Sequence, residues 1–314
     1  MSPNNDKWIA EDLPSMSGRT VVITGASSGL GAITARELAR AGARVVMAVR
    51  DTSKGTRVAR TIPGKTEVLE LDLTSLASIN RFADSWRGEV DVLINNAGVM
   101  YAPEGRTSDG FELHIGTNHL GHFALTNLLL PHITDRVVTL TSNLASGGKI
   151  DLDDLNWEHR PYKASQAYSD SKQANILFTD ELQRRLSKSG SSIRGISAHP
   201  GVAKTNLISH AGGFVGTMNR LVVSVIAQSA EHGAWPLLFA ASQDIPGGSF
   251  VGPNGPGHMR GYPELAKAPK SLQDPDTASK LWGLSAHLTH TEQTFRTRSD
   301  QAFFVTIGRF GVAG

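Results

Sequence analysis

The chain has 314 residues, of which 39% are hydrophobic and none is cysteine. Without cysteine, disulfide scaffolds, zinc–thiolate sites, iron–sulfur clusters and cysteine nucleophiles are all excluded. Its 31 basic and 29 acidic side chains give a formal net charge of +2 and are dispersed along the sequence, so we expect no nucleic-acid partner.

Membrane spans and secretion signals are not expected either. No apolar run approaches the ~18 residues that cross a bilayer. Residues 1–6 are polar and are followed by no apolar signal segment, so the sequence predicts a cytoplasmic protein.

Short apolar, β-branched runs alternate with longer stretches of helical periodicity, which is typical of a parallel sheet covered by helices. Strands are predicted at residues 20–24, 44–49, 67–71, 90–95, 136–141, 194–199 and 249–251. Helices are predicted at residues 29–41, 75–86, 111–130, 166–188 and 230–242. We expect an α/β fold, a Rossmann-type doubly wound, seven-stranded parallel sheet flanked by helices on both faces.

The domain organisation follows from the same pattern. No Pro-, Ser- or Gly-rich linker divides the first 290 residues, so residues 18–290 are predicted to form a single domain. The polar residues 1–17 are predicted to be a flexible N-terminal segment. Residues 291–314 do not continue the strand–helix pattern and are expected to be a C-terminal extension, to which the sequence assigns no role.

A glycine-rich turn, T-G-A-S-S-G-L-G at residues 24–31, follows the first predicted strand and opens the first helix. Gly25 permits a tight turn, Gly29 lets the backbone approach a pyrophosphate, and Gly31 allows close packing, while the helix N-terminus offers free N–H groups. The same letters match a nucleophile elbow centred on Ser27. An elbow follows several strands already built upstream, whereas only about 20 residues precede this one, so a dinucleotide site is predicted.

The nucleotide type depends on the end of the second strand. A carboxylate there would bind the ribose 2′-OH of NAD, and an arginine would pair with the 2′-phosphate of NADP. Arg50 takes the first position after the strand, which favours NADP(H). Asp51 is adjacent, so a register shift of one residue would favour NAD(H) instead.

Tyr168 and Lys172 stand four residues apart, which places both on one face of a predicted helix. A free tyrosine with a pKa near 10 is about 0.1% ionised at pH 7, so its use as a phenolate base requires roughly 4 kcal/mol from its surroundings. The Lys172 ammonium and an oxidised nicotinamide ring could together supply most of that stabilisation.

Four markers occur in order along the chain: T-G-x-x-x-G-x-G at 24–31, N-N-A-G at 95–98, Ser142 at the tip of the fifth strand, and Y-x-x-x-K at 168–172. With Asn118 and the Pro200-Gly201 turn, they identify a chain that resembles the short-chain dehydrogenase/reductase family, in its compact single-domain form, over about residues 18–290.

The resemblance implies a role for each marker. Ser142 would hydrogen-bond the substrate oxygen, Tyr168 would transfer the proton, Lys172 would lower the pKa of Tyr168 and bind the nicotinamide ribose, and Asn118 would hold a water that relays protons. No metal is implied. The implied cofactor contacts are Gly25, Ser27, Ser28, Gly29, Leu30, Gly31, Arg50, Asp72, Leu73, Asn96, Ala97, Gly98, Tyr168, Lys172, Pro200, Gly201, Val202 and Thr205.

Several of these residues have a second interpretation. Asp72 and Thr205 could each be helix N-caps. Ser142 competes with other hydroxyl residues near the end of the same strand, namely Thr139, Thr141 and Ser146; we choose it as the last hydroxyl of that strand.

Ser142 and Tyr168 lie 26 positions apart, and the stretch between them, at 148–157, resembles the retinol-dehydrogenase-like and protochlorophyllide-reductase-like branches. The histidine that commonly follows the serine in those branches is replaced by N-L-A-S at 143–146. After Thr205, glycines and then apolar residues at about 206–229 resemble a substrate lid, which implies a hydrophobic alcohol or carbonyl substrate. Leu221, Val222, Val225 and Ile226 could instead be the core of an ordinary helix.

The sequence therefore predicts an NADP(H)-dependent oxidoreductase that interconverts an alcohol and an aldehyde or ketone. Two alternatives stay open: a nucleotide-binding regulatory relative without turnover, and an NAD(H)-preferring dehydrogenase. The glycine spacing disfavours an extended epimerase, and the four-residue Tyr–Lys spacing disfavours an enoyl reductase. The resemblance also implies that the helices at 111–130 and 166–188 can pair two copies, while His119, His122 and His199 are interpreted as packing or surface residues.

Overall fold

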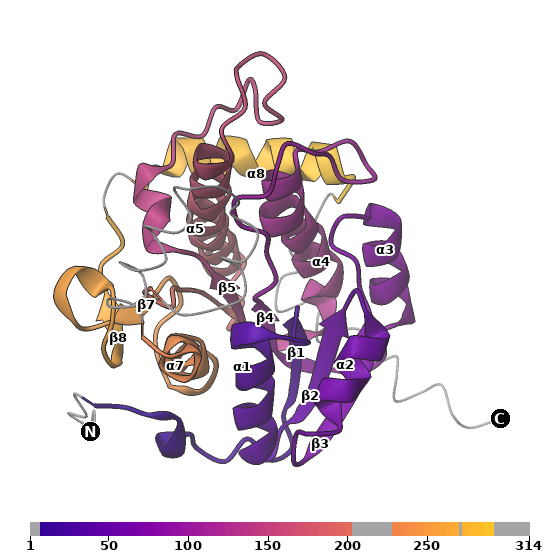
Figure 1. Ribbon diagram of the computed structural model, residues 1–314, viewed down its shortest axis with the longest axis vertical. Coiled ribbons are helices and arrows are strands. Elements are labelled where there is room, and N and C mark those ends of the chain that lie inside the picture. Colours follow the sequence, from indigo (N-terminus) through magenta and orange to yellow (C-terminus); the bar gives the residue numbers. More distant parts are fainter. Residues whose placement is uncertain (1–6, 203–227, 270–271, 292–314) are drawn as a thin grey trace.

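The computed structural model describes residues 7–202, 228–269 and 272–291. In this part of the chain, eight strands form one sheet in the order β3-β2-β1-β4-β5-β6-β7-β8 (Figure 1). The strands are β1 (Thr20–Thr24), β2 (Arg44–Val49), β3 (Lys65–Glu70), β4 (Val90–Asn95), β5 (Ile133–Leu140), β6 (Arg194–Ala198), β7 (Phe250–Pro253) and β8 (Pro263–Ala266). The longer helices are α1 (Gly29–Arg40), α2 (Thr52–Ala59), α3 (Leu76–Ser85), α4 (Gly121–Leu129), α5 (Ala164–Lys188), α7 (Ala230–Ser242) and α8 (Pro275–Thr289). The expected Rossmann-type doubly wound α/β fold is confirmed.

The sheet has a hydrophobic core on each face, because successive strand residues point to opposite sides. Val21 and Ile23 of β1 pack into a core shared with α1 and α7. Between them in sequence, Val22 packs into the opposite core, shared with α3, α4 and α5. In Figure 1, α1 and α7 lie together, away from α4 and α5.

At one edge, the sheet differs from the expected seven parallel strands, because it has an eighth strand. β8 runs antiparallel to β7, with Val251 opposite Leu265 and Gly252 opposite Glu264. The sequence does not predict β8, because this strand has four residues, begins with Pro263 and exposes Leu265. It therefore lacks the apolar run of a buried parallel strand.

Three helical features also differ from the prediction. α2 is an additional helix, whose N-cap Asp51 accepts a hydrogen bond from the Lys54 backbone N–H. α8 is a second additional helix, with Asp274 as its N-cap and Pro275 in its first turn. The helix predicted at 111–130 begins instead with a π-helical turn, η2 (Ile115–Leu120), which leads into α4.

α8 lies across α4 and α5, as Figure 1 shows. The Trp282 ring stacks on Phe178 of α5, with ring centroids 5.7 Å apart, and meets Phe123 of α4 edge-on at 4.9 Å. Ser285 Oγ is 2.8 Å from His119 Nε2. α8 therefore covers part of the helical face that was expected to pair two copies. Among the described residues, no helix combines the length and the apolarity that a bilayer crossing requires.

Candidate active site

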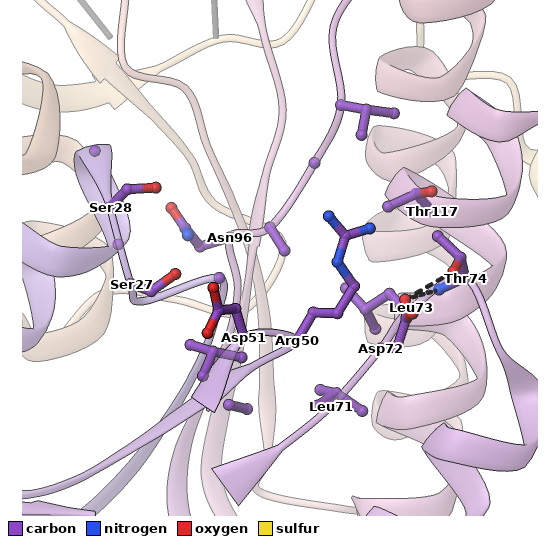
Figure 2. Close-up of a pocket in the computed structure, with 18 of the residues that line it drawn as sticks. Ser27, Ser28, Arg50, Asp51, Leu71, Asp72, Leu73, Thr74, Asn96 and Thr117 are labelled. Atoms are coloured by element: carbon purple, nitrogen blue, oxygen red, sulfur yellow. Dashed lines mark hydrogen bonds between the residues drawn. The ribbon is translucent and has the colours of Figure 1, made fainter. Parts of the chain in front are cut away.

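A cavity of about 890 Å³ opens at the carboxyl ends of β1, β2 and β4, where the strand order reverses between β1 and β4. Figure 2 shows Ser27 and Ser28 on one side of it and Asp72, Leu73 and Thr117 on the other. The predicted cofactor contacts that line this cavity are Gly25, Ser27, Ser28, Gly29, Leu30, Gly31, Arg50, Asp72, Leu73, Asn96, Ala97 and Gly98.

The glycine turn has the shape that a dinucleotide requires. Gly25 has φ +69°, and a Cβ on it would lie 2.9 Å from Ala97 Cβ. A Cβ on Gly31 would lie 2.5 Å from Asn96 Nδ2 and 2.7 Å from Gly25 O, so α1 packs tightly against the turn. The Ser28 side chain makes no capping hydrogen bond, which leaves the first amides of α1 open to a phosphate group. These residues fit a nicotinamide dinucleotide.

Asp51 and Arg50, the two residues that could bind the ribose of the cofactor, differ in their existing hydrogen bonds. Asp51 Oδ1 accepts a 2.8 Å hydrogen bond from Lys54 N, so this carboxylate caps α2. Arg50 is exposed and has neither a hydrogen-bond nor an ion-pair partner within the described ranges. Both Arg50 and Lys54 line the cavity, and Figure 2 shows the Arg50 guanidinium pointing into it.

Asp72 does not cap α3. Its Oδ1 accepts hydrogen bonds from Thr74 N at 2.9 Å and Thr74 Oγ1 at 2.7 Å, while Ser75 is the N-cap. The carboxylate thus shapes the turn after β3 that forms one wall of the cavity.

None of the four predicted catalytic residues lines this cavity, but two of them lie next to its wall: a Cβ on Gly98, which lines it, would lie 2.9 Å from Asn118 Oδ1 and 3.6 Å from Lys172 Nζ. Tyr168 and Lys172 are both buried on α5, with Lys172 Nζ 5.9 Å from the Tyr168 ring centroid and 3.1 Å from Leu140 O. Ser142 follows β5 and acts on the pKa of the Tyr168 phenol, and its Oγ accepts a 3.2 Å hydrogen bond from Leu144 N. Asn118 in η2 donates to Ser171 Oγ at 2.9 Å, which joins the π-helical turn to α5.

The other hydroxyl residues near the end of β5 are engaged elsewhere or lie in the sheet. Thr141 Oγ1 donates to Lys172 O at 2.8 Å, and Ser146 Oγ donates to Asn143 O at 2.8 Å. Thr139 is buried within β5. Of this group, Ser142 is the hydroxyl residue that acts on the pKa of the Tyr168 phenol.

Burial is the main cause of the pKa shifts of Tyr168 and Lys172. It raises the pKa of Tyr168 to about 12, although Ser142 acts in the opposite direction. Burial also lowers the pKa of Lys172 to about 8. In the free chain the phenol is thus protonated at neutral pH, and the lowered pKa expected of Tyr168 is not a property of the chain alone.

Both polar atoms of the Asn118 side chain have hydrogen-bond partners in the protein. Its Oδ1 accepts from Val99 N at 2.8 Å, and its Nδ2 also donates to Val99 O at 3.0 Å. Its backbone carbonyl lies 3.0 Å from His122 Nδ1, and His122 Nε2 lies 2.8 Å from Thr24 Oγ1. His122, expected to be a packing residue, therefore also links Thr24, at the start of the glycine turn, to η2, which carries Asn118.

The turn after β6 is held from two sides. Gly201 N donates to His199 Nδ1 at 3.3 Å. Val202 N donates to Met259 O at 2.8 Å, and Val202 O accepts from Gln228 N at 2.9 Å. Both backbone groups of Val202 thus have protein partners, although the resemblance assigns Val202 to the cofactor. Thr205 and most of the expected lid, 206–227, lie outside the described residues.

Comparison with known proteins identifies the family. Residues 19–212 match the family described as short chain dehydrogenase. The chain belongs to the short-chain dehydrogenase family. Retinol dehydrogenase 13 of Homo sapiens is 41% identical over 88% of this chain and 86% of its own length. Polyprenol dehydrogenase of Mus musculus is 41% identical over 73% of each chain.

The fold also matches a solved structure at high identity. A crystal structure of an uncharacterized protein from Mycobacterium Paratuberculosis superposes with a TM-score of 0.82, at 54% identity, and covers 92% of this chain and 100% of that one. The sequence-based assignment to an NAD(P)-dependent short-chain dehydrogenase of the retinol-dehydrogenase-like branch is therefore confirmed. Across the described residues, no group of three or more metal-ligating side chains is gathered in one place.

Sequence reasoning overlooked a set of residues around Tyr168. The rings of Tyr101 and His114 meet the Tyr168 ring edge-on, with centroids 5.7 Å and 6.2 Å away. Glu112 and Tyr162 lie behind His114. Two features of the sequence could have indicated this set: the acid–x–histidine spacing of Glu112 and His114, and an aromatic residue, Tyr162, in the long segment between Ser142 and Tyr168. Neither feature is specific to such a cluster.

Proposed function

We propose that the chain is an NADP(H)-dependent oxidoreductase that interconverts a hydrophobic alcohol with its aldehyde or ketone, with Tyr168 as the general acid and base. The observation that carries the proposal is the buried Tyr168–Lys172 pair on α5, with Ser142 acting on the Tyr168 phenol, next to a cleft shaped for a dinucleotide. Membership of an oxidoreductase family supports the same reaction class.

In the direction of carbonyl reduction, Ser142 orients the substrate oxygen and the Tyr168 phenol donates its proton to that oxygen. A bound nicotinamide cofactor supplies the hydride. The Lys172 ammonium stabilises the phenolate that remains on Tyr168 after the proton has left. Asn118 holds the segment that follows β4 against α5 through Val99 and Ser171, and its role in a water relay stays a prediction.

The preference for NADP(H) rests on the two side chains at the end of β2. Asp51 already caps α2, whereas Arg50 points into the cavity without a partner among the described residues. An unpaired guanidinium suits a 2′-phosphate, because arginine forms bidentate charge-assisted hydrogen bonds with phosphate. A dehydrogenase that prefers NAD(H) is the remaining alternative.

The substrate class draws support from the relatives. Their names refer to retinol and polyprenol, both hydrophobic isoprenoid alcohols, and they align with most of this chain. A protonated Tyr168 in the free chain suits proton donation, so we include reduction of the corresponding aldehydes in the proposal. The cytoplasmic location and the pairing of two copies stay predictions; a pair built on α4 and α5 would have to contact α8.

The deciding experiment follows the fluorescence of NADPH with a panel of hydrophobic aldehydes, including retinal, and ketones. We expect loss of the reduced-cofactor signal with at least one of them, at a rate that scales with enzyme concentration. Tight NADPH binding without consumption across the panel would support a regulatory nucleotide-binding protein and contradict the proposed function.

A further inference from the structure

A buried polar cluster lies directly behind the catalytic tyrosine. Glu112 and His114 are 2% and 0% exposed, and Glu112 Oε1 is 2.8 Å from His114 Nδ1. Tyr162 brings its hydroxyl within 3.2 Å of the same carboxylate oxygen. The second oxygen, Glu112 Oε2, accepts from Ile115 N at 2.8 Å.

The hydrogen bonds determine where the protons lie. Ala102 N donates to His114 Nε2 at 3.2 Å, so Nε2 is an acceptor and the proton of the neutral ring is assigned to Nδ1. His114 Nδ1–H then donates to Glu112, and the single Tyr162 hydroxyl proton is shared between Glu112 Oε1 and Ala102 O, each 3.2 Å away. Burial alone would raise the pKa of Glu112, but the hydrogen bonds from His114 and Ile115 outweigh burial and hold this pKa below its usual value.

Of the two rings that flank Tyr168, one belongs to this cluster and the other adjoins a residue that the cluster bonds. One flanking ring is His114 itself. The other is Tyr101, whose neighbour Ala102 is held by its N–H to His114 and by its carbonyl, which lies 3.2 Å from the Tyr162 hydroxyl. Through Ile115 N, the Glu112 carboxylate also holds the first residue of the π-helical turn that carries Asn118.

The long segment between Ser142 and Tyr168 is anchored so that Tyr162 reaches this cluster. Arg160 lies 3.3 Å from Asp154 and 3.6 Å from Asp170 of α5. Its guanidinium also stacks over the Trp157 ring at 3.8 Å. The segment is thus fastened to α5 next to Tyr168, which is two residues before Asp170.

We propose that Glu112, His114 and Tyr162 form a positioning cluster for the acid–base step, which orients the Tyr168 phenol and the turn carrying Asn118, and that the segment 148–163 serves to supply Tyr162. The inference rests on the proposed function, because it assumes that Tyr168 transfers the proton. The three residues act through Tyr168.

The test uses Tyr162→Phe, which removes one hydroxyl and keeps the ring. Tyr262→Phe is the matched control, since the Tyr262 ring stacks on Trp235 and its hydroxyl has no hydrogen-bond partner in the described ranges. For each full-length variant, kcat and KM for a hydrophobic aldehyde, the NADPH Kd and the melting temperature are measured, with kcat normalised to NADPH-binding sites. We expect Tyr162→Phe to lower kcat about 10-fold while the NADPH Kd changes less than about two-fold. Glu112→Gln, where it binds NADPH, should lower kcat at least as much.

A double-variant cycle separates positioning from general stabilisation. On a Tyr168→Phe background the phenol is gone, so adding Tyr162→Phe should lower the residual rate by less than about two-fold. A loss of about 10-fold on that background, or a Tyr162→Phe enzyme as active as Tyr262→Phe, would overturn the inference and leave the proposed function standing. A Tyr168→Phe enzyme with full activity would overturn both.

Discussion

At the scale of single residues, the environment of Tyr168 decides its protonation. Its burial raises its pKa to about 12, and the nearby Lys172 ammonium, with a pKa lowered by burial to about 8, contacts a backbone carbonyl rather than the phenol. The free chain therefore holds a protonated acid beside a hydroxyl that can orient a substrate oxygen. This arrangement suits proton donation more readily than proton abstraction.

Replacing Tyr168 with Phe should remove the proton donor and leave the cleft intact. We expect turnover to fall by ~10²–10⁴-fold while NADPH still binds with nearly the wild-type Kd. Steady-state rates and a fluorescence titration with NADPH measure the two quantities. Unchanged turnover would exclude Tyr168 from the mechanism.

Arg50 should decide the choice of cofactor. Arg50→Asp removes a cation that can pair with the 2′-phosphate and adds an anion, so the NADPH Kd should rise about 10- to 100-fold while the NADH Kd changes little. Arg57→Asp is the control, because Arg57 lies near the end of α2 and does not line the cavity. A wild-type chain that binds NADH more tightly than NADPH would contradict the argument.

At the scale of elements, the junction between β1 and α1 depends on the absence of side chains. Gly31→Ala would place a Cβ within 2.5 Å of Asn96 Nδ2 and 2.7 Å of a backbone oxygen, so the turn must shift. We expect a loss of NADPH affinity of at least about 10-fold, measured by fluorescence titration. Gly283→Ala in α8 is the control, since a Cβ there meets nothing within 4 Å and alanine favours the helix.

α8 is the element that closes the core over α4 and α5. Trp282→Ala removes a ring packed on Phe123 and Phe178, so the free energy of unfolding should fall by about 3–5 kcal/mol. Urea unfolding measures this loss. Trp235→Ala provides the comparison, because Trp235 is only partly buried, and a loss as large as that of Trp282→Ala would argue against this account of α8.

At the scale of the whole molecule, buried histidines couple stability to pH. Burial lowers the pKa of His119 to about 3, and the pKa values of His122 and His199 to about 4. The unfolded chain binds protons at these sites near pH 6.5, whereas the folded chain does not. The folded state is therefore favoured fully above about pH 6.5 and loses this advantage as the pH falls towards 4.

The free energy of unfolding should therefore fall steeply as the pH decreases on the acid side of the stability curve. The free energy of unfolding, measured by urea titration at pH 7, 6 and 5, should decrease towards pH 5, with each histidine contributing up to about 1.4 kcal/mol per pH unit. His119→Phe should flatten this decrease, and substitution of the exposed His159 by Phe should not. Equal slopes in all three proteins would contradict the assignment.

The features that the sequence determined by itself are local along the chain. The alternation of strands and helices, the glycine turn at 24–31 and the Tyr168–Lys172 spacing each depend on residues within about two helical turns, so periodicity and spacing reveal them. These patterns were enough for the Rossmann-type fold, the family and the reaction class.

The tertiary structure decided what depends on partners far apart in the chain. β8 exists because β7 offers an open edge, and α8 because α4 and α5 expose aromatic rings to it. The engagement of the Val202 backbone and the convergence of Glu112, His114 and Tyr162 behind Tyr168 likewise join distant segments. A hydrogen bond or ring contact between such segments does not change the hydrophobic periodicity of either segment, so the sequence pattern does not reveal it. Each polar or aromatic side chain could contact many others, and only the folded chain brings one particular pair together.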